Sequence, residues 1–380
     1  MINVTKTKLP DIKEYIKYLK KIWSNGWVTN NGEFVQLLEK KLQEYLKVKN
    51  LLVVSNGTLA LQLVLKALGL KGEVITTPFT FAATTNVILW ENLKPVFADI
   101  DPETFNLNPE EAEKKITKET SAIMPVHVYG NPCDVETFQG IADKYNLKLI
   151  YDAAHAFSVQ YRKKSILTYG DISILSFHAT KVFNTIEGGA IITKDEDLFE
   201  KLKLLRDFGI KSDEKVVLPG INAKMNEFQA AMGLCNLEGI NKEIQLRKKV
   251  YERYKKMLGG NKDIKFQELI ASKYNYAYMP VLFMDIKKRD EIYAELIKNG
   301  IKPRKYFFPL TVNFDYFKKK GMNLVEKYNL RIASDIAERV LCLPLYPDLD
   351  IKTVDKIIDI IKKNAKKSKV SLNNHPRLSS

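Results

Sequence analysis

Cysteines are few in this sequence, and none is placed as a disulfide framework or a zinc site requires. Cys133, Cys235 and Cys342 are isolated along 380 residues, and no C-x-x-C pair occurs. Secreted disulfide scaffolds and zinc ribbons need several cysteines at short, regular spacings. The sequence therefore excludes both classes, and we expect a protein of the reducing cytoplasm with no metal site.

Long apolar runs are missing as well. The first ten residues, MINVTKTKLP, lack the apolar stretch of a signal peptide, and no run approaches the ~20 residues that cross a bilayer. Glycine (18 residues) and proline (14 residues) are too scarce for a fibrous or disordered chain, whereas 45% of the residues are apolar. We therefore expect a folded protein with a large core and no membrane partner.

The net charge of +15 leaves two interpretations open. Lysines on solvated surfaces would explain it, and so would an attraction for anionic substrates such as phosphates. A nucleic-acid partner is not expected, because no helix-turn-helix unit and no basic stripe interleaved with aromatic residues are recognisable.

Short β-branched runs alternate with helical patterns through the first half of the chain. We expect strands at 51–54, 73–77, 95–99, 121–126, 147–152, 172–177 and 189–193. Helical patterns lie between the first five of them, at 58–68, 81–90, 109–115 and 135–145, and two amphipathic helices precede them. This alternation predicts an α/β fold with a mostly parallel central sheet flanked by helices.

The second half has a different character. Two separate helices are expected at 226–237 and 243–257, and few strands follow Gly259-Gly260. We predict a large domain over residues 1–240, which includes the N-terminal helices, and a smaller C-terminal α+β domain over residues 241–368. We leave residues 369–380 out of the fold as a tail.

Polar residues follow several of the expected strands, at the edge where ligands bind in open parallel sheets. The run 55–58, Ser-Asn-Gly-Thr, opens a helix whose free N–H groups suit a phosphate, although the same residues also form an ordinary helix cap. Asp152 ends another strand, where a buried carboxylate needs a partner. It is either a structural cap or the partner of a protonated pyridine nitrogen, with Ala154 leaving room for a flat ring.

Lys181 lies in an apolar and hydroxyl-rich segment, SFHATKVFNTIEGGA. Burial would lower the pKa of such a lysine and make it a Schiff-base nucleophile, a role that arginine could not take. A single lysine is otherwise most often a surface residue. A phosphate turn, an aspartate and a lysine, in this order, are the groups that pyridoxal 5'-phosphate (PLP) requires. The sequence therefore predicts PLP as the cofactor.

Long segments of the chain point to a family. They are WVTNNGEFVQLLEKKL, SNGTLALQLVLKALG, GEVITTPFTFAATTNVILW, KPVFADIDPETFNLNPE, VHVYGNPCDV, YDAAHAF, SFHATK, EGGA, GINAKMNEFQAAMG and LCLPLYP. With them the chain resembles the sugar aminotransferases of the DegT/StrS family, which have fold type I of the aspartate aminotransferase superfamily. The resemblance covers nearly the whole chain.

The resemblance implies a role for each matching residue around the cofactor. Lys181 forms the Schiff base and moves the proton between cofactor and sugar carbon, and Asp152 binds the pyridinium nitrogen. Phe81 and Ala154 lie against the two faces of the ring, and His155 lies near its hydroxyl. The residues implied at the phosphate are Gly57, Thr58, Ser176 and, from the neighbouring subunit of a homodimer with composite sites, Asn222.

Three further residues are candidates for contact with the substrate. Lys224 stands where the family commonly has arginine, so it keeps the charge but loses the bidentate fork. His178 either contacts the substrate or packs, and Tyr306 lies in a peripheral segment. Family members that remove a hydroxyl carry histidine in place of Lys181, so the lysine favours transamination.

The resemblance implies that L-glutamate converts PLP to the pyridoxamine form, which then aminates a nucleotide-linked 4-keto-6-deoxyhexose. The segments GNPCDV, DAAHAF, SFHATK and IKPRKYFFP most resemble enzymes that make dTDP-4-amino-4,6-dideoxyglucose, a sugar of O-antigen type. The expected substrate is therefore dTDP-4-keto-6-deoxyglucose. Three alternatives stay open: an enzyme for the 3-keto isomer, an enzyme for free amino acids alone, and a non-catalytic PLP-fold regulator or nucleic-acid binder.

Overall fold

The computed structural model describes residues 1–371, with side chains for residues 1–364. The tail that we left out of the fold falls largely outside the described residues, although 369–371 belong to the last helix, α13 (Ile351–Ser371). None of the helices in the described part combines the length and the apolar character that a membrane span requires.

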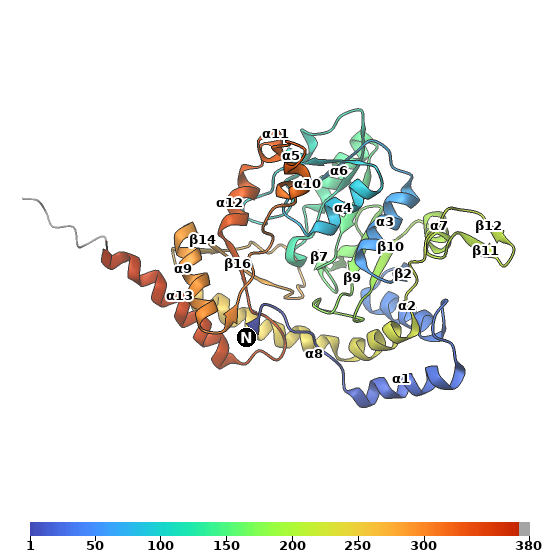
Figure 1. Ribbon diagram of the computed structural model, residues 1–380, viewed down its shortest axis with the longest axis horizontal. Helices are drawn as coiled ribbons and strands as arrows, with labels where there is room; N and C mark the ends of the chain where they lie inside the picture. The colour runs from blue at the N-terminus through green and yellow to red at the C-terminus, as the bar shows by residue number, and fades with distance from the viewer. Residues whose placement is uncertain (372–380) are drawn as a thin grey trace, which may run out of the picture.

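A central sheet forms the middle of the molecule (Figure 1). β10 alone runs antiparallel to its two neighbours, so the predicted mostly parallel sheet is confirmed. Within residues 1–371 the order of its strands is β2 (Asn50–Val54), β10 (Gly189–Thr193), β9 (Ile172–Ser176), β6 (Lys148–Asp152), β5 (Thr120–Met124), β3 (Glu73–Thr76) and β4 (Lys94–Phe97).

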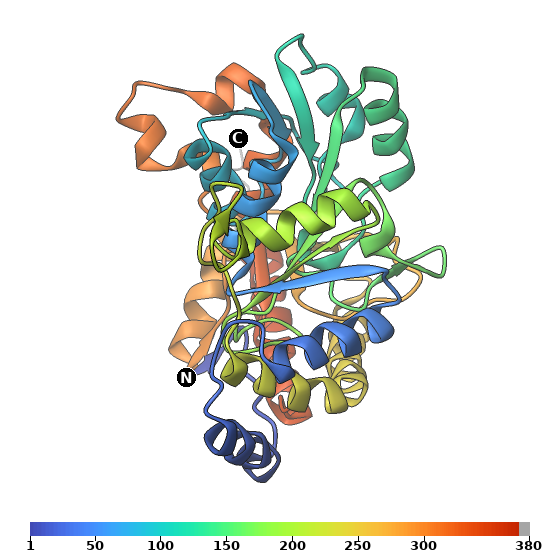
Figure 2. The same cartoon turned by 90° about the vertical axis from the view of Figure 1, so that its right-hand side faces the viewer.

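Helices cover both faces of this sheet, as the sequence predicts. Strand residues alternate between the two faces, so that Leu52 and Val54 join one apolar core while Leu51 and Val53 join the other. The helices on the first face are α3 (Gly57–Leu68), α4 (Ala82–Trp90) and α7 (Glu196–Arg206), of which α7 is not among the predicted helices. The second face carries α2 (Glu33–Leu46), α6 (Val135–Tyr145) and α8 (Glu227–Leu258), with α1 (Ile12–Asn25) outside α8 (Figure 2).

The prediction of two helices at 226–237 and 243–257 is wrong, because α8 runs without a break from Glu227 to Leu258. Gly239 lies within this helix without interrupting it, and an added Cβ there would have the Oε1 of Glu243 at 4.0 Å. Ile240 and Ile244 are buried and continue the apolar face across this region. The domain boundary that we predict at residue 240 falls within this helix, and the division into domains stays a prediction.

The C-terminal part has the predicted α+β character. An antiparallel sheet of β13 (Ile264–Phe266), β14 (Met279–Phe283) and β16 (Val340–Leu343) packs with α9 (Ile286–Lys298), α12 (Arg331–Arg339) and α13. β15 (Ile301–Lys302) pairs in parallel with β1 (Ile2–Asn3) at the start of the chain. The remaining short elements are α5 (Pro109–Glu113), β7 (Gln160–Tyr161), β8 (Lys164–Ser165), β11 (Ile210–Ser212), β12 (Lys215–Val216), α10 (Asp315–Lys318) and α11 (Leu324–Tyr328).

Strand register brings the functional segments to one edge of the central sheet. Asp152 at the end of β6 pairs with Ile174 of β9, and Ser176 at the end of β9 pairs with Gly189 of β10. Gly189 also pairs with Val54, the last residue of β2, directly before the turn that opens α3. The carboxyl ends of β2, β6 and β9 therefore meet, where ligands bind in sheets of this kind.

Candidate active site

A cavity of about 380 Å³ lies at this edge of the sheet. The predicted site residues that line it are Gly57, Thr58, Phe81, Asp152, Ala154, His155, Ser176, His178, Lys181 and Tyr306. Asn222 and Lys224 do not belong to its lining. The structure thus brings together residues separated by up to 249 positions in the sequence, and it leaves two of the predicted ones elsewhere.

The amine of Lys181 is chemically unusual for a lysine. Burial in the cavity wall lowers its pKa, the charge of Asp152 counteracts this effect and that of Arg304 adds to it, and the resulting pKa is about 8. The ordinary pKa of a lysine is 10.5. Because the pKa of Lys181 is lower, an appreciable fraction of this amine is neutral near physiological pH. A neutral amine is the form that attacks a carbonyl carbon.

This pKa predicts the pH at which Lys181 becomes reactive. In cofactor-free protein, trace labelling with acetic anhydride should rise with pH and reach half its maximum near pH 8, because only the neutral amine reacts. Peptide mass spectrometry measures the label on each lysine. Asp152→Asn should shift the midpoint to lower pH, because it removes the charge that favours the ammonium form. A midpoint near 10.5 would contradict the assigned environment.

Asp152 is held in place by two hydrogen bonds and is only 4% exposed. Its Oδ2 accepts a bond of 2.8 Å from the Thr84 hydroxyl, and its Oδ1 accepts one of 3.1 Å from the Ala154 backbone N–H. Thr84 also lies 2.8 Å from the hydroxyl of Thr80. Burial raises the pKa of Asp152, and these bonds together with the charge of Lys181 counteract that rise. A fixed carboxylate at this depth suits a cationic ring nitrogen.

The start of α3 forms an open cradle beside Ser176. Asn56 caps the helix, and its Oδ1 accepts a hydrogen bond of 2.9 Å from the backbone N–H of Leu59. An added Cβ on Gly57 would lie 3.0 Å from the Cβ of Ser176, and one on Gly189 would lie 2.9 Å from the backbone nitrogen of Gly57. Glycine at both positions lets the backbone approach this closely, and the free N–H groups of the helix suit a phosphate.

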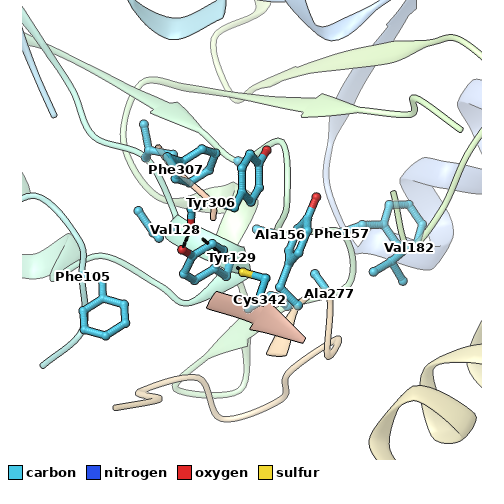
Figure 3. Packing of buried hydrophobic residues seen from close by; sticks show 14 of the residues in the cluster. Phe105, Val128, Tyr129, Ala156, Phe157, Val182, Ala277, Tyr306, Phe307 and Cys342 are labelled. Carbon is cyan, nitrogen blue, oxygen red and sulfur yellow. Dashed lines mark hydrogen bonds between the residues drawn. The ribbon is translucent and has the colours of Figure 1, made fainter. Parts of the chain in front are cut away.

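Aromatic rings close another side of the cavity. The ring of His155 is parallel to that of Phe307 at 5.9 Å and lies 4.8 Å from that of Tyr278. Figure 3 shows Phe307 and Tyr306 above Tyr129, whose hydroxyl donates a hydrogen bond to the carbonyl of Tyr306. Burial lowers the pKa of His155 well below its ordinary value, so the ring is neutral. Its buried Nδ1 has no hydrogen-bond partner among the residues that the structure describes.

His178 lies at the exposed side of the cavity among polar groups. Its Nδ1 accepts a hydrogen bond from the backbone N–H of Thr180 at 3.3 Å and lies 2.9 Å from the hydroxyl of that residue. Its Nε2 is 3.6 Å from the Oε1 of Glu187. Nearly half of its side chain is exposed, so His178 is not part of a packed core. A contact with substrate stays a prediction.

Asn222 and Lys224 lie outside the cavity of their own chain. Asn222 is exposed, and its backbone pairs with that of Asp207. The Nζ of Lys224 forms an ion pair with Asp207 and lies 4.8 Å from the ring centre of Phe208. The charge of Lys224 is therefore neutralised within its own chain. The roles that the sequence assigned to these two residues stay predictions.

Comparison with known proteins identifies the family of proteins to which this site belongs. The model of the DegT/DnrJ/EryC1/StrS aminotransferase family matches residues 10–362. The chain belongs to this family. It is a PLP-dependent aminotransferase, as the sequence predicts.

Individual family members match over almost their whole length. A dTDP-4-amino-4,6-dideoxy-D-glucose transaminase from Escherichia coli is 44% identical over 364 residues, which are 95% of this chain and 98% of that protein. A GDP-perosamine synthase from Vibrio cholerae is 31% identical over 91% of this chain and 95% of its own. The crystal structure of DesI in the presence of its TDP-sugar product superposes with a TM-score of 0.89, at 30% identity, over 98% of this chain and 95% of that chain.

The residues of the cavity fit PLP on structural grounds. The glycine cradle at α3 suits its phosphate, and the buried Asp152 suits its ring nitrogen. The unpartnered Nδ1 of His155 suits a hydroxyl on the ring. When bound, PLP supplies an electron sink for the bond that breaks at the donor's α-carbon. Lys181 is then the group in the cavity wall whose lowered pKa suits it to carry a proton.

Sequence reasoning missed several residues of the site. Thr84 is not in the lining but donates a hydrogen bond to Asp152, and it is one of two adjacent threonines in α4, with no local signal to single it out. Arg304 lies in IKPRKYFFP, the segment that resembles the family and contains the predicted Tyr306. Tyr278 also lines the cavity and directly precedes β14.

Proposed function

We propose that the protein transfers the amino group of L-glutamate to C4 of dTDP-4-keto-6-deoxyglucose and forms dTDP-4-amino-4,6-dideoxyglucose. The observation that carries this proposal is the 44% identity to a transaminase of that name over 98% of its length. The similarity to a solved structure that holds a TDP-sugar product supports a nucleotide-linked sugar as substrate. The surplus of 15 positive charges suits an anionic nucleotide diphosphate.

Five side chains of the cavity have a task in this reaction. Lys181 takes the proton from the α-carbon of the donor in the first half and delivers a proton to C4 of the sugar in the second half. Asp152 keeps the ring nitrogen of the cofactor protonated. The buried rings of Tyr278, Tyr306 and Phe307 keep bulk water from the reacting carbon.

A panel of keto-sugars tests the substrate. The enzyme should be given dTDP-4-keto-6-deoxyglucose, its 3-keto isomer, and UDP- and GDP-linked 4-keto-6-deoxyhexoses, each with glutamate, and kcat/KM should be measured. We expect the dTDP-linked 4-ketone to exceed the others by at least about tenfold, because a misplacement of about 1 Å already impairs attack. A preference for the 3-ketone, for a GDP- or UDP-sugar, or for amino acids alone would replace the proposed substrate.

We also propose a symmetric homodimer in which each cavity receives Asn222 from the other subunit. Asn222 is exposed and outside its own cavity, and it lies close in sequence to the β11–β12 hairpin, which projects from the body of the molecule (Figure 1). A residue placed in this way is free to serve a second copy across a two-fold axis.

Mixed mutants test this arrangement. Lys181→Ala and Asn222→Ala subunits should each have low activity alone, and random reassociation should restore about a quarter of the wild-type activity, because half of the dimers contain one intact site. Activity is measured after mild dissociation and mixing, with unmixed parents as controls. A mixture no more active than the mean of its parents, or an active monomer in sedimentation, would contradict the composite site.

A cytoplasmic location, without a membrane or nucleic-acid partner, completes the proposal. Cys133, Cys235 and Cys342 are all buried and free, which suits a reducing compartment. A gel shift with bulk DNA that persists at moderate salt would instead support the alternative of a nucleic-acid binder.

A further inference from the structure

Tyr129 is a fully buried tyrosine behind the wall of the cavity, and it has no task in the reaction as derived so far. It lies in the short turn 128–130 and is not part of the cavity lining. Figure 3 shows it beneath Tyr306 and Phe307, which do line the cavity. Its hydroxyl donates a hydrogen bond to the carbonyl of Tyr306. Burial raises the pKa of Tyr129 well above its ordinary value, so the phenol keeps the proton that it donates.

The segment that this hydrogen bond holds, residues 305–309, has few other polar connections through its backbone. Before it, Arg304 pairs with strand β16, and after it the N–H of Thr311 donates to the loop that follows β3. Among residues 1–364, no backbone hydrogen bond joins 305–309 to the rest of the chain. A thiol of β16 approaches the carbonyl of Tyr306 only to 4.0 Å, and thiols are weak donors. The hydroxyl of Tyr129 therefore holds this backbone between its two ends.

The turn that carries Tyr129 has a backbone conformation that its surroundings must hold. The φ of Tyr129 is 58°, in the left-handed region that residues other than glycine rarely adopt. Such residues persist where their contacts determine their position, and they gather at functional sites. The hydroxyl of Tyr274 donates to the carbonyl of Tyr129 at 2.8 Å. On the other side, an added Cβ on Gly130 would lie 2.6 Å from the carbonyl oxygen of His155, so the turn is packed directly against the site.

The ring of Tyr129 makes a separate connection to the site. It is parallel to the ring of Phe307, with 5.7 Å between the ring centres, and the ring of Phe307 is parallel to that of His155 at 5.9 Å. The hydroxyl of Tyr129 thus acts on the backbone of Tyr306, whereas its ring acts on Phe307 and, through it, on His155. A phenylalanine at position 129 would remove the hydrogen bond and keep the stack of rings.

We propose that Tyr129 is a positioning residue for the amination, and that its hydrogen bond to the peptide group between Tyr306 and Phe307 holds both side chains beside the reacting carbon. The inference deepens the proposed function and rests on it to the extent that these two residues border the bound sugar. A displacement of this peptide group moves both side chains, and about 1 Å is enough to impair attack. Tyr129 itself takes no part in proton transfer.

Removal of the hydroxyl alone tests the proposal, with a matched tyrosine as control. Tyr129→Phe keeps the ring. The control is Tyr254→Phe, because Tyr254 is also fully buried, its hydroxyl donates to the carbonyl of Pro344 at 3.2 Å, and it lies outside the cavity lining. Both variants leave a buried carbonyl without its partner and should lower the melting temperature by similar amounts. Tyr274→Phe is a second test, since it loosens the turn but keeps the hydroxyl of Tyr129.

The measurements are kcat at saturating substrates and Kd for PLP, both well below the melting temperatures. Tyr129→Phe should lower kcat about tenfold, Tyr274→Phe about threefold and Tyr254→Phe less than about twofold, because only the first two alter the wall of the cavity. Kd for PLP should stay within about twofold of wild type in all three variants, because the stack of rings that reaches His155 is kept. The kinetics use the keto-sugar of the panel that the wild type aminates fastest, so a different sugar would overturn the proposed substrate without affecting this comparison.

A loss of kcat in Tyr129→Phe no larger than the loss in Tyr254→Phe would overturn the assignment, because it would show a contribution to stability alone. A loss of PLP affinity as large as the loss of kcat would overturn it as well, since the hydroxyl would then act on the cofactor. If Tyr129→Phe did not fold, an unchanged kcat in Tyr274→Phe would be the contradicting result.

Discussion

Lys181→Ala should lose turnover by a factor on the order of 10⁴ or more, because it removes both the nucleophile and the group that carries the proton. The cavity around it should persist, since the cradle at α3 and the bonds to Asp152 do not involve Lys181. The variant should therefore still bind PLP, without a covalent link. Single-turnover kinetics with glutamate measure the loss, and PLP absorbance measures the binding.

The control for this variant is Lys40→Ala, which removes an exposed lysine of α2 outside the cavity and should keep full activity. Borohydride reduction of the wild-type holoenzyme should attach the cofactor to the peptide that contains Lys181, and Lys181→Ala should lose that attachment. If Lys181→Ala retained more than a few per cent of activity, or if the label appeared on another lysine, Lys181 would lose its assigned role.

Asp152→Asn should lower kcat by about 10²–10³-fold, the range for removing one charge-stabilising group from an active site. The side chain keeps its size and can still accept a hydrogen bond from Thr84, so the protein should remain folded. An amide cannot hold a proton on the ring nitrogen as a carboxylate does. The measurement is kcat, together with a melting curve that shows the fold is intact.

Thr84→Val distinguishes the effect of the Asp152 charge from the effect of the hydrogen bond that holds this carboxylate in place. This variant keeps the carboxylate but removes its hydrogen bond of 2.8 Å, so we expect a loss about tenfold, the usual effect of one hydrogen bond to a charged group. Full activity in Asp152→Asn would show that Asp152 is only a cap at the end of β6.

Most of the central sheet could be predicted from the sequence, because its strands are apolar runs buried on both faces. Val135–Tyr145 and Gly189–Thr193 match their predicted bounds. The wrong or missing predictions concern helices whose extent depends on packing more than on the local sequence pattern. The expected break between residues 237 and 243 does not occur, because the buried Ile240 and Ile244 continue the apolar face of α8 across it. α7 lies in a charged segment and depends on the few residues that it buries against the sheet.

Some residues of the site could likewise be predicted from the sequence, and others could not. Asp152 and Ser176 end two strands of one sheet and Gly57 comes shortly after a third, and strand order alone brings such residues together. Arg304 and Phe307 enter the cavity from the C-terminal part, and their approach depends on how that part packs against the sheet. No periodicity in the sequence indicates how closely the C-terminal part approaches the sheet. Asn222 depends on a second copy, which one chain does not contain.

The most direct test of the account follows the nitrogen atom. Purified enzyme should be incubated with PLP, ¹⁵N-labelled L-glutamate and dTDP-4-keto-6-deoxyglucose, and the product examined by NMR. We expect ¹⁵N bonded to C4 of the sugar, in the equatorial position, with one 2-oxoglutarate formed for each amino sugar. An amine at C3, an unlabelled product, or an unchanged dTDP-linked ketone would contradict the account.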